Sequence, residues 1–446
     1  MRATFHLKTL SVAVAALSVA SLASAAGLDR SGQDITAFLQ DGTYAETVYT
    51  YISADVTGYD SANKNPDVDD YTRGNKTGDI AESYDFFRYG VKTDINDTFS
   101  VGVLYDEPFG AAAKYEGDNN FVADDSGNIP ARIGELIGQG VAPSLAGAIA
   151  TAEAGTAGEG TNVEVRSHNL TAILGMKFGE NKNFQVYGGP VAQRLQADVK
   201  LRGTAYGPAT GYTAHVSPDQ DYGWIAGLSY SKPEIALKAA LTYRSEIDHD
   251  VNIAENYPVL GIAAAAGGAT PAQAAAAANR SGTFEVTTPK SVNFDFQTGI
   301  NPTTLATAKV RWVPWGDFAI VPPLYNDASK GSYGPDGLAL VDYDKDQWQV
   351  ELGMAKRLSP ALAVSGTVGW DSGAGNPVTS LGPIEGYYSA GLGAKYNVTE
   401  NWAISAGGKY LWFGDAKGVL PTGKIVGNFE DNDGYVLGAK ISYQSK

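Results

Sequence analysis

The stretch Leu237-Lys238-Ala239-Ala240-Leu241-Thr242-Tyr243-Arg244-Ser245-Glu246-Ile247-Asp248-His249-Asp250-Val251-Asn252 alternates between two kinds of side chain. One parity carries the apolar residues Leu237, Ala239, Leu241, Tyr243, Ile247 and Val251. The other parity carries Lys238, Thr242, Arg244, Glu246, Asp248, Asp250 and Asn252. Because successive side chains of a strand point to opposite faces of a sheet, this period of two predicts a β-strand. An apolar face opposite a charged face predicts a strand that separates lipid from a polar lumen.

Strands of this kind recur to the end of the chain and predict a closed barrel. We expect them near 45–58, 82–95, 98–115, 161–178, 183–202, 223–231, 235–253, 283–300, 303–318, 347–358, 361–370, 386–396, 401–413 and 434–443. Short turns rich in Gly, Pro, Asn and Asp alternate with long connections, as periplasmic turns alternate with extracellular loops. A soluble β-sandwich also has many strands, but it lacks this asymmetry. The sequence therefore predicts an all-β fold, a transmembrane antiparallel β-barrel of about 14 strands.

Two of the long connections carry helical patterns. The segment Ala131–Ala154 has apolar residues at helical spacing with a break at Pro143, and Gly261–Ala278 is rich in alanine. We expect partly helical extracellular loops. Helices at this place either cover the barrel mouth, form an apolar landing surface, or pack on one another for rigidity.

The N-terminus has the three parts of a secretory signal peptide. Arg2 and Lys8 precede an apolar run from Leu10 to about Leu22, and Ala23-Ser24-Ala25 follows it. The apolar run is too short to span a bilayer, and the small residues are typical of a cleavage site. We therefore expect residues 1–25 to be a signal peptide that is removed on export.

Composition excludes several classes of function. The net charge of −16 argues against a nucleic-acid partner, whose phosphates require a basic surface. There is no cysteine, so neither a disulfide nor a cysteine nucleophile exists. The histidines beyond the signal peptide, His168, His215 and His249, have no metal-ligand spacing along the chain. No nucleophile motif marks a catalytic serine. We expect no enzyme activity, no metal and no cofactor.

The third predicted strand is interrupted. It runs from Phe99 to Tyr105 and then meets Asp106-Glu107-Pro108-Phe109-Gly110. Because proline removes a ladder donor and glycine removes packing, the strand is predicted to kink or bulge there. This interrupted strand resembles the third strand of the FadL/TodX family of outer-membrane transporters, which carry long-chain fatty acids and other hydrophobic compounds.

Other segments are similar to the same family, in the same order along the chain. They are Ala26–Gln33 at the start, Ala240–Glu246 before a long loop, Thr288–Ser291 at the next strand, and Trp312–Trp315. The resemblance covers essentially the whole mature chain. It implies a lumenal N-terminal (hatch) segment at residues 26–44, with Leu28, Asp29, Arg30, Ser31 and Gly32 as hatch residues, and a barrel with long extracellular loops at residues 45–446. This segment is shorter than the hatch of the family and lacks its Asn-Pro-Ala stretch, which leaves open whether it fills the lumen.

The resemblance implies a function as well as a fold. A monomeric barrel in the bacterial outer membrane captures a hydrophobic small molecule, a fatty acid or a hydrocarbon, at its extracellular loops. The molecule leaves sideways through the wall at the kinked strand. We place this exit at the kink residues Glu107, Pro108, Phe109 and Gly110, with the hypothesis that Phe109 is a movable stopper. The alternative is a plain β-bulge with no gate. Outer-membrane lipid and lipopolysaccharide surround the barrel.

Basic residues on the expected lumenal parity are candidates for binding a fatty-acid carboxylate. They are Arg194, Lys200, Arg202, Arg244, Lys309 and Arg311. An arginine offers a carboxylate two parallel hydrogen bonds, which suits such a clamp. The alternative is a ladder of charges across the lumen, in which these cations pair with acidic residues such as Asp198, Glu246, Asp248, Asp250 and Asp295 and hold the barrel together.

Three further functions compete with passive transport of hydrophobic molecules. The runner-up is a general diffusion porin for small polar solutes, which an open step in bilayer conductance would reveal. A structural or adhesive surface protein is another, and an outer-membrane esterase is the most distant.

Overall fold

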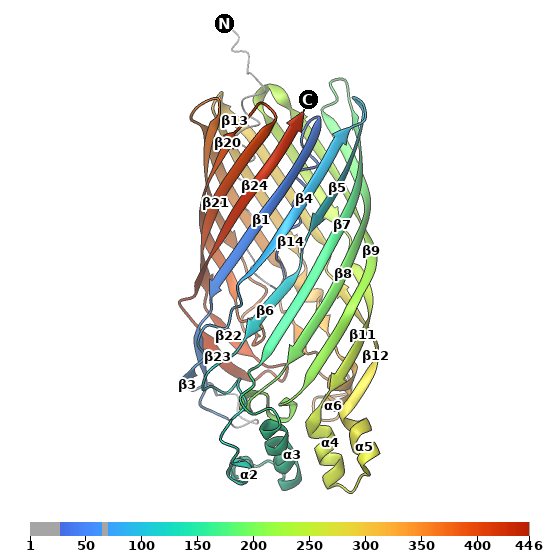
Figure 1. Ribbon diagram of the computed structural model, residues 1–446, viewed down its shortest axis with the longest axis vertical. Coiled ribbons are helices and arrows are strands. Elements are labelled where there is room, and N and C mark those ends of the chain that lie inside the picture. The colour runs from blue at the N-terminus through green and yellow to red at the C-terminus, as the bar shows by residue number, and fades with distance from the viewer. Residues whose placement is uncertain (1–26, 65–69, 446) are drawn as a thin grey trace.

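The computed structural model describes residues 27–64 and 70–445, so the predicted signal peptide lies outside the described residues. It is a closed antiparallel barrel, tall and tilted in its strands (Figure 1). The barrel strands are β1 (Thr43–Asp55), β4 (Tyr84–Asp94), β5 (Phe99–Asp106) with β6 (Gly110–Lys114), β7 (Asn162–Phe178), β8 (Phe184–Lys200), β9 (Thr213–Lys232), β10 (Leu237–Arg244) with β11 (Ile247–Asn256), β12 (Asn279–Thr288) with β13 (Ser291–Asn301), β14 (Thr304–Val313), β17 (Gln347–Arg357), β18 (Leu362–Asp371), β20 (Glu385–Asn397), β21 (Trp402–Gly414) and β24 (Asp433–Ser445).

The predicted strand count is confirmed. The sheet has 17 strands, and three pairs of them are halves of one interrupted strand, which leaves the 14 strands of the barrel. Pairing of β1 with β24 closes the wall into a barrel. Several strands differ from the prediction. β9 begins at Thr213, ten residues before the expected start, and β14 ends at Val313, five residues before the expected end. The strands expected at 235–253 and 283–300 are interrupted after Arg244 and Thr288.

The two ends of the barrel differ, and we name them by their connections. The turn end has the short turns and the end of β24, and lies at the top of Figure 1. The loop end carries α2 (Ile129–Gly138), α3 (Pro143–Ala154), α4 (Pro258–Ala266), α5 (Pro271–Ala278), α6 (Pro323–Ser329) and the 3-10 turns η1 (Thr204–Ala209) and η3 (Trp315–Asp317), whereas η2 (Pro233–Ile235) belongs to a short turn. Small sheets of β2 (Gly58–Ser61), β3 (Arg73–Lys76), β19 (Val378–Thr379), β22 (Ala416–Val419) and β23 (Ile425–Phe429), and of β15 (Ala319–Ile320) with β16 (Val341–Asp342), complete it.

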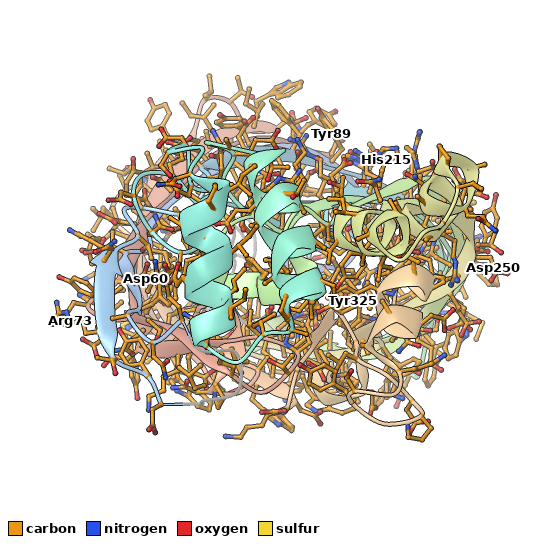
Figure 2. The ribbon with its side chains drawn as sticks, turned by 90° about the horizontal axis from the view of Figure 1, so that it is seen from below. Asp60, Arg73, Tyr89, His215, Asp250 and Tyr325 are labelled. Carbon is orange, nitrogen blue, oxygen red and sulfur yellow. The ribbon has the colours of Figure 1, made fainter. Side chains whose placement is uncertain are left out.

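Both predicted helical loops are helical, and each is a pair of helices. Every one of α2 to α6 has a proline in its first turn, where the missing N–H costs no hydrogen bond. Thr270 caps α5 through a reciprocal pair of hydrogen bonds with Gln273. The helices lie across the barrel mouth, as Figure 2 shows in a view on to the loop end. None of the helices in the described ranges is both long and apolar enough to serve as a membrane span.

Toward the turn end, the outer surface of the barrel is apolar. Leu392 is 77% exposed and Val368 58% exposed, and aromatic residues such as Tyr388 and Trp402 are exposed near the strand ends. An apolar band of this extent with aromatic margins is the surface that a transmembrane barrel presents to lipid. The inward positions of the same strands are polar, among them the buried Ser365, Lys395, Ser405, Lys409 and Lys440.

The stretch Leu237–Asn252 does not keep one parity outward along its whole length, which corrects the interpretation of its alternation. In β10, Leu241 is 52% exposed and Arg244 is buried, as expected. In β11 the parity is reversed: Ile247 and Val251 are buried, and Glu246, Asp248 and Asp250 face outward. The strand breaks at Ser245-Glu246, opposite the break between β12 and β13. Beyond the apolar band the outside is water, so the apolar side chains turn inward.

Candidate functional site

The wall of the barrel lacks its hydrogen-bond ladder beside the predicted kink. Strands β4 and β5 pair as far as Tyr89 and Tyr105, and pairing resumes at a bridge between Ala81 and Ala113. Among the described residues no ladder pair joins 83–88 to 106–111, and we call this region the β4–β6 ladder gap. On the other side of the kink, β7 pairs with both β5 and β6.

The kink is a β-bulge on the β7 side. Asp106 pairs with Asn169 and Gly110 pairs with Arg166, so the kink carries one residue more than the facing part of β7. The hydroxyl of Ser167 compensates for the interrupted ladder: it accepts a hydrogen bond from the Phe109 N–H at 2.8 Å and donates one to the Phe109 carbonyl at 2.7 Å. The bulge is thereby a fixed feature of the wall.

The N-terminal segment occupies the lumen beside this gap. The Gly110 N–H donates to the Leu28 carbonyl at 2.8 Å, and the Arg30 N–H donates to the Pro108 carbonyl at 2.8 Å. Asp29 and Phe109 form an antiparallel bridge. The hatch backbone therefore pairs with the kink from inside, where β4 does not.

Arg30 places its side chain at the ladder gap. Its guanidinium lies 4.0 Å from the ring centroid of Tyr84, at the start of β4, and 3.8 Å from the Glu107 carboxylate. A Cβ on Gly110 would lie 2.3 Å from the Arg30 Cζ, so only glycine leaves room for the guanidinium. Phe109, the predicted stopper, is buried and packs edge-on against Trp315 at 5.7 Å between ring centroids.

Three of the six predicted carboxylate-binding cations lie in the lumen, where most of their contacts are with the hatch. Arg311 donates two hydrogen bonds to the Asp29 carboxylate, at 2.8 and 2.9 Å. Lys309 lies 3.1 Å from an Asp34 carboxylate oxygen. Arg244 is buried and donates to the Thr171 hydroxyl at 3.3 Å. The first two cations therefore anchor the N-terminal segment.

The other three predicted cations do not line the lumen, which corrects their assignment to the lumenal face of the strand. Arg194 and Lys200 are exposed on the outer face of β8, in the part beyond the apolar band. Outward residues there meet water, so a charged parity indicates the outside of the barrel rather than the lumen. Arg202 is buried at the loop end and donates to Glu159 at 2.8 Å and to the Tyr212 carbonyl at 2.9 Å, so it ties loops together. Likewise, Asp198 lies on the outer face.

Apolar residues of the hatch pack against the wall in a separate cluster toward the turn end. Ile35 and Phe38 are fully buried, and their cluster includes Ile173 of β7 and Tyr187 of β8. A Cβ on Gly102 would lie 2.7 Å from the Phe38 ring, so glycine in β5 makes room for it. The short N-terminal segment is thus packed tightly in the lumen, by apolar contacts as well as by the ion pairs.

An apolar chamber lies on the loop side of the hatch. It is lined by Gly27, Leu28, Ala111, Val163, Val165, Ala197, Val199, Ala214, Val216, Ile253, Phe284, Ile320, Pro322, Leu340, Val341, Tyr343, Thr379, Leu381 and Gly382. No charged side chain is among these described lining residues. In the sequence, the feature that indicates this chamber is the row of apolar residues in β8 that alternates with Arg194 and the other charged residues. Leu28 and Ala111 place the chamber directly beside the kink.

The loops that cover the chamber are held by buried polar contacts. The rings of Tyr212, Tyr257 and Tyr325 pack against one another at the loop end, where Figure 2 shows Tyr325 among the helices. The Tyr212 hydroxyl donates to Glu255 at 2.8 Å, and Glu255 also accepts from the backbone N–H groups of Leu324 and Tyr325. Burial, followed by the charge of Glu255, raises the pKa of Tyr212 above its ordinary value, so the hydroxyl stays protonated.

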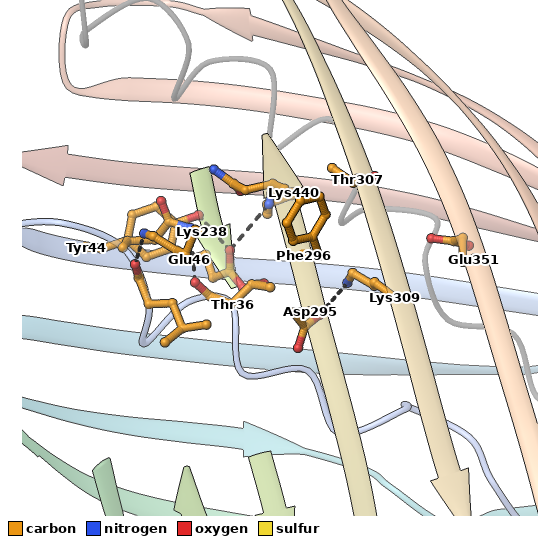
Figure 3. Close-up of a pocket in the computed structure, with 13 residues that line it drawn as sticks. Thr36, Tyr44, Glu46, Lys238, Asp295, Phe296, Thr307, Lys309, Glu351 and Lys440 are labelled. Carbon is orange, nitrogen blue, oxygen red and sulfur yellow. Dashed lines mark hydrogen bonds and ion pairs between the residues drawn. The ribbon is translucent and has the colours of Figure 1, made fainter. Parts of the chain in front are cut away.

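A vestibule lined by several charged side chains lies on the turn side of the hatch (Figure 3). Tyr44 donates a hydrogen bond to Glu46 at 2.7 Å, and Glu46 lies 3.4 Å from the Lys440 ammonium. Lys238 donates to the Leu39 carbonyl of the hatch. The lumen is therefore divided into an apolar chamber and a charged vestibule by the N-terminal segment.

Comparisons with known proteins agree with this architecture. A family model described as outer membrane protein transport protein (OMPP1/FadL/TodX) matches residues 34–444. A Pseudomonas aeruginosa FadL homologue matches with a TM-score of 0.66 at 15% identity, over 96% of this chain and 97% of that one. The toluene transporter TodX of P. putida matches with a TM-score of 0.55 at 12% identity, over 92% and 91% of the two chains. No curated protein matches in sequence.

A third solved structure is similar at the same level. The toluene transporter TbuX of Ralstonia pickettii matches with a TM-score of 0.51 at 12% identity, over 96% of each chain. At these identities the structural likeness shows that the barrel fold is shared.

Proposed function

Because this chain belongs to the OMPP1/FadL/TodX family of outer membrane transport proteins, we propose that it carries neutral hydrophobic molecules sideways through its own wall. It resides in the outer membrane, so the loop end is extracellular and the turn end periplasmic. In this proposal the molecule is captured at the loop end, enters the apolar chamber, and leaves into the outer membrane through the β4–β6 ladder gap.

One observation carries the proposal: the apolar chamber ends at the gap. Ala111 of β6 and Leu28 of the hatch line the chamber, and the Leu28 carbonyl accepts the Gly110 N–H at the kink. A molecule in the chamber would thus reach lipid once the Arg30 side chain moves aside and the hydrogen bond from the Arg30 N–H to the Pro108 carbonyl opens. Straight passage would instead require it to cross the tightly packed hatch and then a vestibule whose lining includes the charged residues Glu46, Lys309 and Lys440.

The lining of the chamber favours a hydrocarbon over a fatty acid. Burying an unpaired carboxylate in apolar surroundings is costly, and the lining offers no cation to compensate. Arg311 and Lys309 are already bound by Asp29 and Asp34, so we assign them to holding the hatch rather than the ligand. Arg244 is the lumenal cation that we retain as a candidate contact for a charged head group.

Binding measurements on the purified barrel test this ligand class. A neutral alkane is expected to displace a fluorescent apolar probe more effectively than a fatty acid of the same chain length. Val165→Lys, which puts a cation into the chamber, is expected to reverse that order, whereas Glu164→Lys on the exposed face of the same strand leaves it unchanged. If Val165→Lys still preferred the alkane to the fatty acid, the chamber would not be the binding site.

Bilayer conductance separates the proposal from a diffusion porin. With the hatch packed in the lumen, the protein is expected to stay nearly closed, whereas a porin would give a steady open step. We further propose that the barrel acts as a monomer in contact with outer-membrane lipid and lipopolysaccharide, with no enzymatic step, since its apolar band faces outward on strands throughout the barrel.

A further inference from the structure

A second interruption of the wall lies between β9 and β11. The two strands pair at Val216 and Ile253, and β9 pairs with β10 at Ile225 and Arg244. Among the described residues no ladder pair joins 217–223 to 246–252, and we call this region the β9–β11 ladder gap. Both strands keep their other neighbours: β9 pairs with β8 on either side of a register shift at residues 217–218, and β11 pairs with β12 throughout.

Three metal-binding side chains meet in this gap. They are Asp219 and Asp221 of β9 and His249 of β11, and one ligand atom from each lies within 4.8 Å of the others. The His249 ring is fully buried, and its Nδ1 lies 3.2 Å from the Asp219 Oδ2. Spacing along the chain does not indicate this trio, because the three residues come together only when two strands are placed side by side.

Hydrogen bonds outside the trio fix the orientation of the imidazole. The Gln193 side chain donates its Nε2–H to Asn169 Oδ1 at 2.9 Å, so its Oε1 points the other way. That Oε1 accepts from the Thr288 hydroxyl at 2.6 Å and from His249 Nε2 at 3.0 Å. A neutral His249 with its hydrogen on Nε2 turns the Nδ1 lone pair toward the Asp219 carboxylate. Two acceptors 3.2 Å apart require a cation or a proton between them.

We propose that Asp219, Asp221 and His249 bind one divalent transition-metal ion, with zinc as the representative, and that this ion bridges β9 and β11. One imidazole with two carboxylates is a ligand set of zinc and related ions, whereas calcium and magnesium prefer oxygen alone. Two ligand atoms at the usual zinc distances lie about 3.3 Å apart in a tetrahedral site, close to the 3.2 Å observed.

The surroundings meet two further requirements of a metal site. A ligating histidine donates its other N–H to an oxygen acceptor, and Gln193 is that acceptor here. The ion also needs an entry path, and the Asp219 side chain is 24% exposed. Such an ion joins two strands where backbone hydrogen bonds are missing, and it leaves coordination positions open to water.

Zinc titration of the purified full-length barrel in detergent tests the proposal. We expect one zinc per chain with a micromolar or tighter dissociation constant, and weak binding of magnesium. Asp221→Asn is expected to weaken zinc at least tenfold and His249→Gln to abolish stoichiometric binding. Gln193→Leu, which removes the acceptor outside the trio, is expected to cost about 10- to 100-fold in affinity.

His215→Gln is the matched control, because His215 also lies beside a carboxylate, 2.6 Å from Asp198, but as an exposed pair. It is expected to leave zinc binding unchanged. Cobalt substitution adds a spectroscopic readout, since its d–d absorption changes when the imidazole ligand is lost. Should His249→Gln fail to fold, Asp221→Asn decides alone. The proposal is overturned if no stoichiometric zinc binds, which would leave a protonated His249 paired with Asp219, or if Asp221→Asn binds zinc as the parent protein does.

Discussion

The two ladder gaps in the wall are filled in different ways. At the β4–β6 gap the missing partner is replaced by the N-terminal segment, which pairs its backbone with Pro108 and Gly110 and places Arg30 beside Tyr84. At the β9–β11 gap the side chains of the wall strands themselves meet, as Asp219 does with His249. A gap filled by a separate segment can open while the wall stays in place. A gap closed by the wall's own side chains strengthens it, so we assign exit to the first alone.

Removing the anchor of the hatch is expected to have the largest effect. Arg311→Ala leaves the Asp29 carboxylate buried without its bidentate partner, and breaking a buried pair in this way costs about 3–5 kcal/mol. We expect a fall of that size in the free energy of unfolding by urea, and frequent open events in planar bilayers as the hatch leaves the lumen. A variant as stable and as closed as the parent would show that the hatch does not depend on this pair.

Metal at the second gap is expected to have the next largest effect, on stability only. Zinc at about a hundred times its dissociation constant should raise the free energy of unfolding by about 2.7 kcal/mol, and a chelator should reverse the change. Uptake of a hydrophobic substrate should stay within about twofold in both conditions. A loss of uptake with the chelator would break the comparison, because both gaps would then serve transport.

Repairing the first gap is expected to reduce uptake at least tenfold, equivalent to about 1.4 kcal/mol. Pro108→Val with Gly110→Val restores a ladder donor and puts a side chain where the Arg30 guanidinium lies. The matched control is Gly366→Val, at a wall position that is paired on both sides and where a Cβ meets only ordinary contacts. Uptake by the double variant equal to that of this control would argue against an exit at the kink.

The smallest effect is expected at the exposed cations. Arg194→Ala and Lys200→Ala remove charges on the outer face of β8, and surface changes of this kind alter stability by less than about 0.5 kcal/mol. Fatty-acid binding should also be unchanged, as fluorescence displacement would show. A marked loss of binding would indicate that ligands first meet the outside of the extracellular wall.

The period of two, together with the alternation of short turns and long connections, was sufficient to predict the barrel and its strand count, and Pro108 and Gly110 were sufficient to predict the kink. It was not sufficient to decide which side chains point out of the barrel. Apolar side chains point outward where the wall meets lipid and inward where it meets water. Leu241 faces lipid and Val251 faces the interior, on the same parity of one stretch. The change of sense occurs at Ser245-Glu246, and neither residue signals a break as proline does.

The contents of the lumen were harder to predict than its wall. Arg311 was recognised as a lumenal cation, but its partner Asp29 is hundreds of residues away in the chain. The trio at the second gap escaped prediction for a different reason: Asp219 and His249 are only 30 residues apart, but they meet at an interruption in the pairing of β9 with β11 that the sequence does not mark. Contacts across a barrel depend on register, which a pattern of period two does not define between distant strands.

Photolabelling most directly tests the claim that hydrophobic molecules leave through the β4–β6 ladder gap. Outer-membrane vesicles would be loaded with an alkane carrying a diazirine group, irradiated, and the labelled positions read by mass spectrometry. The account predicts labels on the chamber residues Val165 and Ala111 and on the gap residues Tyr84 and Glu107. Labels on the hatch and on the vestibule residues Tyr44 and Glu46, with none at the gap, would contradict it, because the molecule would then have passed straight through the barrel.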